Sequence, residues 1–495
     1  MKIILAGYNV DADVIDELAA SREMGDVTPE TISAAYARIS RDPRPVDELR
    51  KLARKEVEKA RRSNKNIIFG LGHHSVAEHA VFNFDIIGVS RLAIEEIEKF
   101  RLCSYTEKSQ RYITLKDEFI VPPEIQGSNL ESRFVKTVNA QNELYHKLFD
   151  RLKERVARWY HDEAESPGEL EIIEGIAKED ARYITSLATA GQLGETINAR
   201  NLELLLRRFA SHELLEVREI GKRMYECVAD VAPSIILFTE ANDYDQKTYP
   251  ALRTVSADLA KTGIQPERPV TVQLVDYTKD ADLVLVVALL HTSTEMSYQK
   301  CREVGEKLSL EKKREIVKTA CQRMELYDPV LREFEYIHLS FDIVVSASGF
   351  AQLKRHRMAT ITVQNYTPEL GLTVPQSVID CGMEKEFSSV AEMSERSYHA
   401  LLEQSPSVAP YALTNAHRRR VLLGLNAREL YHFSRLREDL TAQWEIRSVC
   451  RRMTELAREV MPLTMLLVGG KDSYPGIYEQ VYGKPPKVLK PELPT

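Results

Sequence analysis

Three adjacent side chains, Arg355, His356 and Arg357, are the first candidates for chemistry in this sequence. They follow a run with apolar residues at helical spacing, so we expect them at the C-terminal end of a helix. Three cationic or donor side chains in a row cannot all face one core, so at least one must meet solvent, an acidic partner or a bound anion. A basic cluster that only complements the helix dipole is the alternative.

A second polar set lies in the first half of the chain, a few residues after the basic cluster Lys99-Phe100-Arg101 that matches the triplet. It combines hydrogen-bond acceptors and donors of the kind that hold a nucleobase and a phosphate. Its members are Glu107, Ser109, Gln110 and Arg111. A solvated loop is the alternative for these residues.

An internal repeat relates the two halves of the chain. Residues 82–87 recur as residues 339–344, and both runs favour strands that lead into a helix with a basic end. Two later motifs also return: Asn198-Ala199-Arg200 as Asn426-Ala427-Arg428, and Glu216-Val217-Arg218 as Glu445-Ile446-Arg447. Because these matches include polar residues, we predict a duplication rather than a chance similarity.

The repeat predicts two domains, 1–242 and 270–495, joined by a polar, proline-containing linker at 243–269. The expected fold class is α+β, with a mixed sheet packed against long helices in each domain. Helical periodicity is present at 46–62, 134–159, 199–228 and 427–460. The first copy carries an extra polar segment around 131–163, which we expect on the outside.

Composition and charge exclude several classes of protein. The 495 residues are 43% hydrophobic and 28% charged, which excludes a collagen, a disordered tail and a small disulfide scaffold. A net charge of −7, from 67 basic and 74 acidic residues, argues against a nucleic-acid partner. Six cysteines without a Cys-x-x-Cys pair favour a reducing cytoplasm.

Membrane and metal signals are weak. The longest apolar run, 283–290, is far short of the roughly 20 residues that a membrane span needs. The N-terminus turns polar too early for a signal peptide and is typical of a strand entering a turn. His73, His74, Glu78 and His79 lack the His-Glu-x-x-His pattern, so we predict no metal. The glycines around 70–72 and 469–471 match no phosphate-binding loop.

These motifs resemble the flavin-dependent thymidylate synthases of the ThyX type. That family's signature is Arg-His-Arg, seven residues, then Ser in an Asn-Glu-x-Ser-x-Arg-Tyr context. The second copy has an intact Gln-x-x-Arg-His-Arg at 352–357, and its Asn-Ala-Arg through residues 443–447 is similar to the family's NAR…AQWEIR tail. The first copy is similar at 72–79, GHHSVAEH, and carries a degenerate signature at 99–112.

The two copies lose complementary parts of the family pattern. The first keeps the loop and an early arginine but has replaced the family's Gln, Arg, His and late Arg by Glu96, Lys99, Phe100 and Phe209. The second keeps those four but has Val363, Asn365, Thr367 and Pro410 in place of the loop residues and the early arginine. Since family sites are built between subunits, the resemblance implies an intramolecular pseudo-dimer with one complete composite inter-domain site and a dead symmetry mate.

The resemblance implies reductive methylation of dUMP to dTMP, with FAD as cofactor and with NADPH and methylenetetrahydrofolate as co-substrates. A cation beside the uracil ring would stabilise the charge that develops there, so no catalytic cysteine is required. The implied catalytic residues are Arg437, Gln352 and Arg355. The implied substrate-binding residues are Glu107, Ser109, Gln110, Arg111, Arg182, Gln352, Arg355 and Arg437. The implied FAD-binding residues are His73, Ser75, Glu107, Arg355, His356, Arg357, Asn426, Ala427, Arg428 and His432.

Two other functions stay open at this point. One is a non-catalytic flavin- or nucleotide-binding protein that retains the fold, and the other is a related enzyme acting on another pyrimidine nucleotide. Because the family forms tetramers of single domains, the resemblance implies a homodimer of this two-domain chain. The expected partners are small-molecule substrates, with neither nucleic acid nor membrane.

Overall fold

The computed structural model describes residues 1–11, 28–38, 44–70, 72–111, 113–160, 167–260 and 270–487. The chain divides into two compact units. The first unit comprises Met1–Pro266 and Ser377–Thr414, and the second comprises Glu267–Gln376 and Asn415–Thr495. A segment from the second half of the sequence therefore belongs to the first unit.

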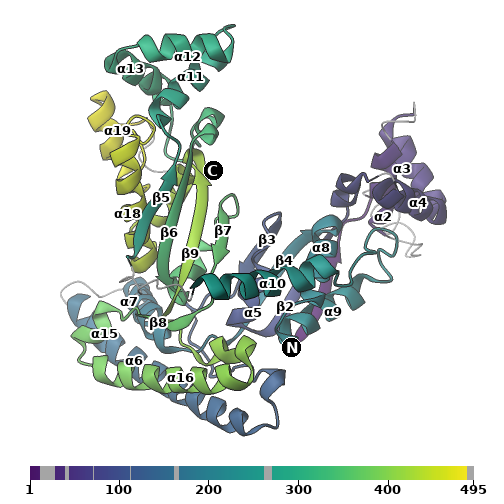
Figure 1. Cartoon of the computed structure of the whole chain (residues 1–495), viewed down its shortest axis with the longest axis vertical. Coiled ribbons are helices and arrows are strands. Elements are labelled where there is room, and N and C mark those ends of the chain that lie inside the picture. The colour runs from purple at the N-terminus through teal and green to yellow at the C-terminus, as the bar shows by residue number, and fades with distance from the viewer. Residues whose placement is uncertain are drawn as a thin grey trace. The chain divides into compact units, whose positions relative to one another are not determined.

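An antiparallel sheet organises the first unit, and its described strands follow the order β1–β2–β4–β3 (Figure 1). The strands are β1 (Lys2–Tyr8), β2 (Val81–Ser90), β3 (Cys103–Glu107) and β4 (Ala190–Asn198). Phe82, Phe84 and Ile86 are buried while the residues between them are exposed, as period-2 alternation requires. Helices α5 (Arg91–Ile97), α8 (Ala199–Ala210) and α9 (Leu215–Val228) pack against these strands.

The second unit repeats this sheet order as β5–β6–β9–β7, with β8 also paired to β9 (Figure 1). Its strands are β5 (Val272–Tyr277), β6 (His338–Ser346), β7 (Thr360–Val363), β8 (Thr367–Leu372) and β9 (His417–Asn426). Strand β6 alternates as β2 does, burying Leu339, Phe341 and Ile343. The shared strand order confirms the predicted tandem α+β repeat.

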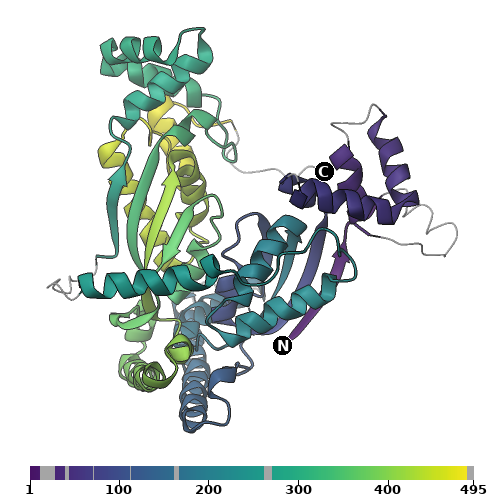
Figure 2. The ribbon, with the colours of Figure 1, turned by 45° about the vertical axis from the view of Figure 1, so that its right-hand side comes forward.

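Helices complete the second unit. The 3-10 helix η5 (Arg332–Tyr336) precedes β6, α14 (Ala347–Leu353) follows it, and α17 (Ala427–Arg437), α18 (Trp444–Val460) and α19 (Tyr474–Tyr482) follow β9. Helices α11 (Ala281–Ser293), α12 (Tyr298–Lys307) and α13 (Leu310–Cys321) gather at one end of the sheet (Figure 2). The apolar run 283–290 lies inside α11, and no helix among the described residues is long and apolar enough to cross a membrane.

The long helices of the first unit come from both halves of the sequence. Helix α6 (Asn129–Tyr160) packs against α7 (Pro167–Ala181) and against α16 (Glu384–Gln404) (Figure 1). Gln141 of α6 is fully buried and donates to Ser394 Oγ at 2.7 Å and to the carbonyl of Ala412 at 2.9 Å. Helix α6 has one buried and one exposed face, and residues 161–163 lie outside the described residues, so the outside position of this segment stays a prediction.

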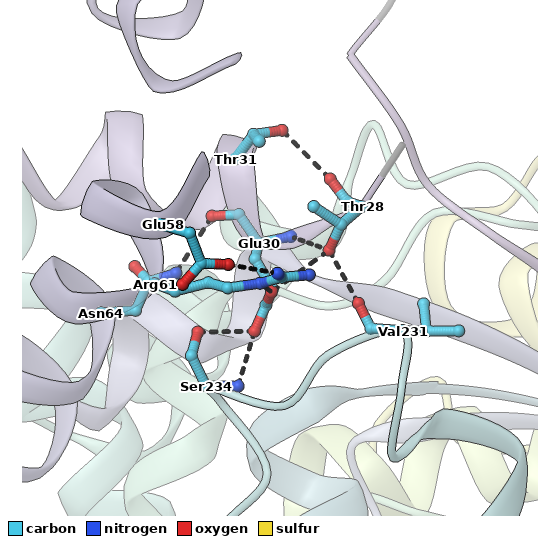
Figure 3. A network of polar contacts seen from close by, with 8 residues as sticks. All are labelled: Thr28, Glu30, Thr31, Glu58, Arg61, Asn64, Val231 and Ser234. Carbon is cyan, nitrogen blue, oxygen red and sulfur yellow. Dashed lines mark hydrogen bonds and ion pairs between the residues drawn. The ribbon is translucent and has the colours of Figure 1, made fainter. Parts of the chain in front are cut away.

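A polar network anchors the N-terminal helices, α2 (Glu30–Arg38), α3 (Val46–Lys55) and α4 (Val57–Asn64). Figure 3 shows its centre, the fully buried carboxylate of Glu30. One oxygen of Glu30 accepts from the backbone N–H and the hydroxyl of Ser234, at 2.6 and 2.5 Å. The other accepts from Arg61 Nε at 2.8 Å. A buried carboxylate satisfied on both oxygens fixes α2 and α4 to the segment that follows α9.

Three of the predicted helical stretches are interrupted. Residues 46–62 form α3 and α4, 199–228 form α8 and α9, and 427–460 form α17 and α18. Apolar periodicity continues across each break, so it does not mark where one helix ends and the next begins. In the second unit the Gln443 side chain accepts from the backbone N–H groups of Glu445 and Ile446, at 3.0 and 3.1 Å, and so starts a new helix.

The predicted linker at 243–269 begins with a helix, α10 (Asp243–Ala260), which contains Pro250. Asp245 of this helix accepts from Arg207 Nε at 2.7 Å, so α10 is tied to α8 of the first unit. Residues 261–269 lie outside the described residues. The boundary between the two sequence repeats stays a prediction.

The first sheet contains a buried acid where the second has a leucine. Glu195 pairs with Phe84 and Tyr105, and Leu423 pairs with Phe341 and Ile361 in the corresponding places. Glu195 is 2% exposed, and neither carboxyl oxygen has a hydrogen-bond partner. Burial, with a contribution from Glu98, raises the pKa of Glu195 to about 8.

We predict that Glu195→Leu stabilises the first unit by about 1–3 kcal/mol at neutral pH, the cost of an unsatisfied buried polar group. Because the pKa of Glu195 is raised in the folded state, wild-type stability should decline as pH rises from about 4.5 to about 8. The leucine variant should lack this decline. Urea unfolding followed by Trp159 fluorescence, in a Trp444→Phe background, measures both effects. Parallel pH profiles for the two proteins would contradict the prediction.

Candidate functional site

A buried serine–glutamate pair fixes the strand-to-helix turn in each unit. In the second unit, Ser346 ends β6 and caps α14, and both its N–H and its hydroxyl donate to the carboxylate of Glu445 on α18. In the first unit, Ser90 donates in the same way to Glu216 on α9, at 2.7 and 2.6 Å. The pair sets where the following helix points, and that helix carries the candidate site.

Close packing at this turn leaves no room for a side chain at Gly349. A Cβ atom there would lie 2.5 Å from Val345 Cγ2 and 3.0 Å from the Glu445 carboxyl carbon. The turn in the second unit is therefore tightly constrained. It places Gln352 at the end of α14 and the basic triplet immediately after it.

The basic triplet divides between core and solvent. Arg355 and Arg357 are exposed, whereas His356 is only 3% exposed. The sequence-based prediction that the three side chains cannot share one core is confirmed. His356 packs against Phe433, with ring centroids 4.0 Å apart.

A chain of hydrogen bonds links His356 to Arg437, the last residue of α17. Arg437 Nε donates to His356 Nε2 at 2.9 Å, and Arg437 Nη1 donates to Gln352 Oε1 at 3.0 Å. On the other side of the ring, His356 Nδ1 lies 3.2 Å from Glu429 Oε1. We name this set, Glu429–His356–Arg437–Gln352, the arginine relay. It brings together three of the residues that the sequence predicted to act on substrate or flavin.

The protonation states of the relay follow from its geometry. Since Nε2 of His356 accepts from a guanidinium, the proton of the neutral ring must lie on Nδ1, where it is donated to Glu429. Burial, followed by the charges of Arg437 and His432, lowers the pKa of His356 well below its ordinary value. Burial also raises the pKa of Glu429, while His432 and Arg428 oppose that increase. The ring is therefore neutral at physiological pH.

The same positions in the first unit are filled by aromatic side chains. Phe100 stands in the place of His356 and Phe209 in that of Arg437, and their rings meet edge to face with centroids 6.0 Å apart. Gly221 makes room for Phe209, because a Cβ there would lie 2.8 Å from Phe209 Cβ. An apolar pair cannot orient a polar ligand, so this half lacks the relay's chemistry.

The first unit instead gathers arginines beside the loop that the sequence singled out. Arg182, 4% exposed, begins the 3-10 helix η4 (Arg182–Ile184) and donates to the carbonyl of Glu179 at 3.3 Å. Arg111 pairs with the Glu179 carboxylate and donates its backbone N–H to Ser109 Oγ at 3.1 Å. Burial lowers the pKa of Arg182; Glu179 opposes this shift, and Arg111 and Arg91 add to it. The Glu179 carboxylate compensates part of this positive charge, and the guanidinium N–H groups are donors of the kind that bind an anion.

Three residues of these networks escaped sequence analysis. Arg91 is 2% exposed, and its guanidinium contacts Glu95 at 3.3 Å and Glu107 at 3.5 Å. Glu179 holds Arg111, and Glu429 holds His356. The partners of Glu179 and Glu429 are distant in sequence, whereas Arg91 differs between the two copies, since Ala347 stands in its place in the second copy. That substitution was visible in the sequence.

The predicted flavin-binding residues are distributed over both units. In the second unit, exposed His432 lies 5.9 Å from His356, measured between ring centroids, and Arg355 and Arg357 are exposed as well. Asn426 caps α17 through the N–H of Glu429 at 2.8 Å. Arg428 donates to the carbonyl of Val330 and to Glu335, and Ala427 is fully buried. In the first unit, His73 precedes η2 (His74–His79) and Ser75 lies within it, both exposed, and Glu107 ends β3.

The predicted loop of the first unit is only partly assembled around the arginines. Ser109 and Gln110 are half-buried, and Tyr112 lies outside the described residues. In the second unit, Val363 pairs with Val421 of β9, as Glu107 pairs with Leu193 of β4, and Thr367 pairs with Arg418 of β9. Pro410, which replaces the early arginine, lies in η6 (Pro406–Ala412) of the first unit.

One group of side chains has metal-ligand chemistry among the described residues. Donor atoms of His356, Glu429 and His432 lie within 4.8 Å of one another. Both ring nitrogens of His356 are engaged, however, and the Arg437 cation stands beside the ring. These contacts fit a hydrogen-bond relay better than a cation site.

Inorganic phosphate should stabilise the first unit if its arginines form an anion site. At about 100 times its dissociation constant, a ligand that binds only the folded state stabilises it by about 2.7 kcal/mol. Arg182→Ala should lose most of this stabilisation, whereas Arg207→Ala, at a surface ion pair with Asp245, should keep it. Unfolding midpoints measured against phosphate at constant ionic strength give the comparison. An equal response in both variants would exclude the site.

Comparison with known proteins finds one family model that matches each of the two repeats separately. The family model described as "Thymidylate synthase complementing protein" matches residues 24–234 and 273–463. A flavin-dependent thymidylate synthase of Clostridium tetani is 31% identical over 215 residues, covering 43% of this chain and 82% of the relative. A UPF0159 protein of Chlamydia muridarum is 24% identical over 422 residues, covering 82% of this chain and 79% of the relative.

Among solved structures, the flavin-dependent thymidylate synthase ThyX of Helicobacter pylori, complexed with FAD and dUMP, is 19% identical. The match covers 38% of this chain and 93% of that one, with a TM-score of 0.28. The family model, in contrast, spans both repeats and together more than half of the sequence. The chain therefore belongs to the thymidylate synthase complementing protein family.

Proposed function

We propose that this protein is a flavin-dependent thymidylate synthase, which methylates dUMP reductively to dTMP with methylenetetrahydrofolate and NADPH. The observation that carries the proposal is complementary retention. The first unit keeps a buried arginine set and the second keeps the arginine relay, while each has lost the other's set. Independent decay of two unused copies would not be expected to divide the residues so cleanly. The relative from Clostridium tetani bears the name of this activity.

The first unit's residues would hold the phosphate and ribose of the nucleotide. Arg182 and Arg111 supply guanidinium donors, and the Ser109 hydroxyl supplies a further donor. Glu107 and Gln110 complete the proposed substrate set. A dianionic phosphate would accept charge-assisted hydrogen bonds from these guanidinium groups, in place of part of the pairing that Glu179 provides to Arg111.

The second unit's residues would act on the uracil ring. Arg437, with Gln352 and Arg355, would place positive charge and N–H donors beside the ring's carbonyl oxygens and N3. Negative charge develops there when C5 acts as a nucleophile, so a fixed cation lowers the barrier. The relay holds Arg437 through two hydrogen bonds, so little reorganisation is needed when that charge develops.

The residues present fit FAD in their donor chemistry. Arg355, Arg357 and His432 offer exposed cationic or N–H groups suited to a pyrophosphate, and in the first unit His73 offers a ring N–H and Ser75 a hydroxyl. Asn426 and Arg428 already serve the fold, so we assign them secondary roles in flavin binding. When bound, FAD supplies hydride transfer, which the chain's own side chains do not provide.

The decisive assay is dTMP formation from dUMP by the full chain with FAD, NADPH and methylenetetrahydrofolate under low oxygen. We expect product from the wild type. Arg182→Ala and Arg437→Ala, from different repeats, should each reduce kcat/KM by at least about 100-fold, because each removes a charge-assisted contact worth up to about 3 kcal/mol.

Two matched substitutions serve as controls. Lys99 and Asn365 occupy the degenerate positions of their copies, so Lys99→Ala and Asn365→Ala should leave kcat/KM within about twofold, as surface changes usually do. Equal losses in all four variants would remove the argument from complementary retention. FAD binding without dTMP formation would favour a non-catalytic protein or another pyrimidine substrate.

We further propose that two chains associate, as a homodimer that reproduces the domain number of the family's tetramers. Analytical ultracentrifugation of the FAD-loaded protein should give about twice the mass of one chain. A fully active monomer would contradict this proposal without affecting the proposed reaction.

A further inference from the structure

Glu429 has no role among those that the sequence or the family resemblance assigned. It lies on the first turn of α17, and its carboxylate is buried with a side-chain exposure of 7%. We propose that Glu429 is a positioning residue: by accepting the Nδ1–H of His356, it keeps Nε2 of that ring available to orient Arg437. The inference rests on the proposed contact between Arg437 and the uracil ring.

The two hydrogen bonds of the His356 ring determine which of its nitrogens carries the proton. A neutral imidazole has one donor and one acceptor nitrogen, so its two bonds must be opposite in sense. Arg437 can only donate, and it approaches Nε2 at 2.9 Å. An acceptor must therefore face Nδ1, and Glu429 Oε1 supplies it at 3.2 Å. Without that acceptor, the ring could protonate Nε2 and lose its bond to Arg437.

Arg437 in turn orients the side-chain amide of Gln352. Its Nη1 donates to Gln352 Oε1 at 3.0 Å, which fixes the orientation of the Gln352 amide. With the amide oxygen engaged, the amide nitrogen is the group that can donate to a carbonyl of the ligand. One buried carboxylate thus determines the direction of two side chains that are proposed to contact the base.

The first copy has no acid at the position that matches Glu429, and it also lacks the histidine and the arginine. Asn201 stands in the place of Glu429, and its side chain donates to Asn198 Oδ1 at 2.8 Å within its own helix cap. Phe100 and Phe209 replace the ring and the guanidinium that would need an oriented acceptor. The helix start alone therefore does not require an acid at this position. The acid is present where the histidine and arginine are present.

A matched glutamate on the same helix offers a control. Glu438 follows Arg437 and accepts from Ser434 Oγ at 2.7 Å and from Thr454 Oγ1 at 2.8 Å, without a bond to His356. Glu438→Gln changes a partly buried carboxylate that joins the C-terminal end of α17 to α18 through Thr454. This control variant distinguishes an effect of disturbed packing around α17 from an effect on the orientation of the His356 ring.

The test uses the full chain, labelled with nitrogen-15 histidine, and needs no substrate. Two-bond proton–nitrogen spectra distinguish the two neutral tautomers, and the His356→Asn variant assigns the signal. We expect the Nδ1–H tautomer in the wild type, in Glu429→Gln, whose amide oxygen can still accept, and in Glu438→Gln. Glu429→Leu should shift the ring toward the Nε2–H tautomer.

A second readout is dUMP affinity, measured by equilibrium titration of the FAD-loaded protein. Glu429→Leu should raise the dissociation constant by about 10- to 100-fold, as expected when a charge-assisted contact is lost. Glu429→Gln should recover most of the affinity, which a merely structural role would not predict, and Glu438→Gln should match the wild type.

Several outcomes overturn the inference. An Nε2–H tautomer in the wild type does so directly, and this result stands even if Glu429→Leu fails to fold. An unchanged tautomer in Glu429→Leu does so as well. Because the tautomer is measured without substrate, a failure to form dTMP would reject the proposed function while leaving this measurement decisive for Glu429.

Discussion

The buried serine–glutamate pair at the end of the central strand is the constraint on which both units depend. Ser346 bonds Glu445 through two donors while its oxygen caps α14, so one residue joins a strand, a short helix and a long helix. Ser90 and Glu216 repeat this arrangement. A carboxylate buried in this way must keep its donors, because leaving one unsatisfied costs about 1–3 kcal/mol. The turn therefore stays fixed while the side chains beyond it diverge.

Beyond that turn, the second copy fills the equivalent space with hydrogen-bonded polar side chains, and the first copy fills it with aromatic side chains. The second copy buries a polar chain in which each donor meets an acceptor, which orients Arg437 but is costly if any member is lost. The first copy fills the place with Phe100 and Phe209, which pack without directional demands and allow Gly221 to approach closely. Its polar residues are concentrated around Arg182 instead. Each copy thus keeps one of the two polar sets that the proposed function requires.

Much of the fold was predictable because its signals are local or repeated. Alternation along 82–87 and 339–344 predicted β2 and β6, and matched polar motifs predicted the duplication. Interruptions such as that between α17 and α18 were missed because Gln443 caps a helix without changing apolar periodicity. The buried face of α6 depends on Ser394, far along the chain. Glu429 was missed for the same reason: its partner, His356, is distant in sequence, and no spacing rule connects them.

The central claim is that the two copies together serve one nucleotide, not two. Equilibrium titration of the FAD-loaded chain with dUMP, with the active protein concentration determined independently, counts the sites most directly. The account predicts one dUMP bound per chain, with binding lost in both Arg182→Ala and Arg437→Ala. Two equivalent sites per chain, or a single site that depends on only one of these arginines, would contradict it.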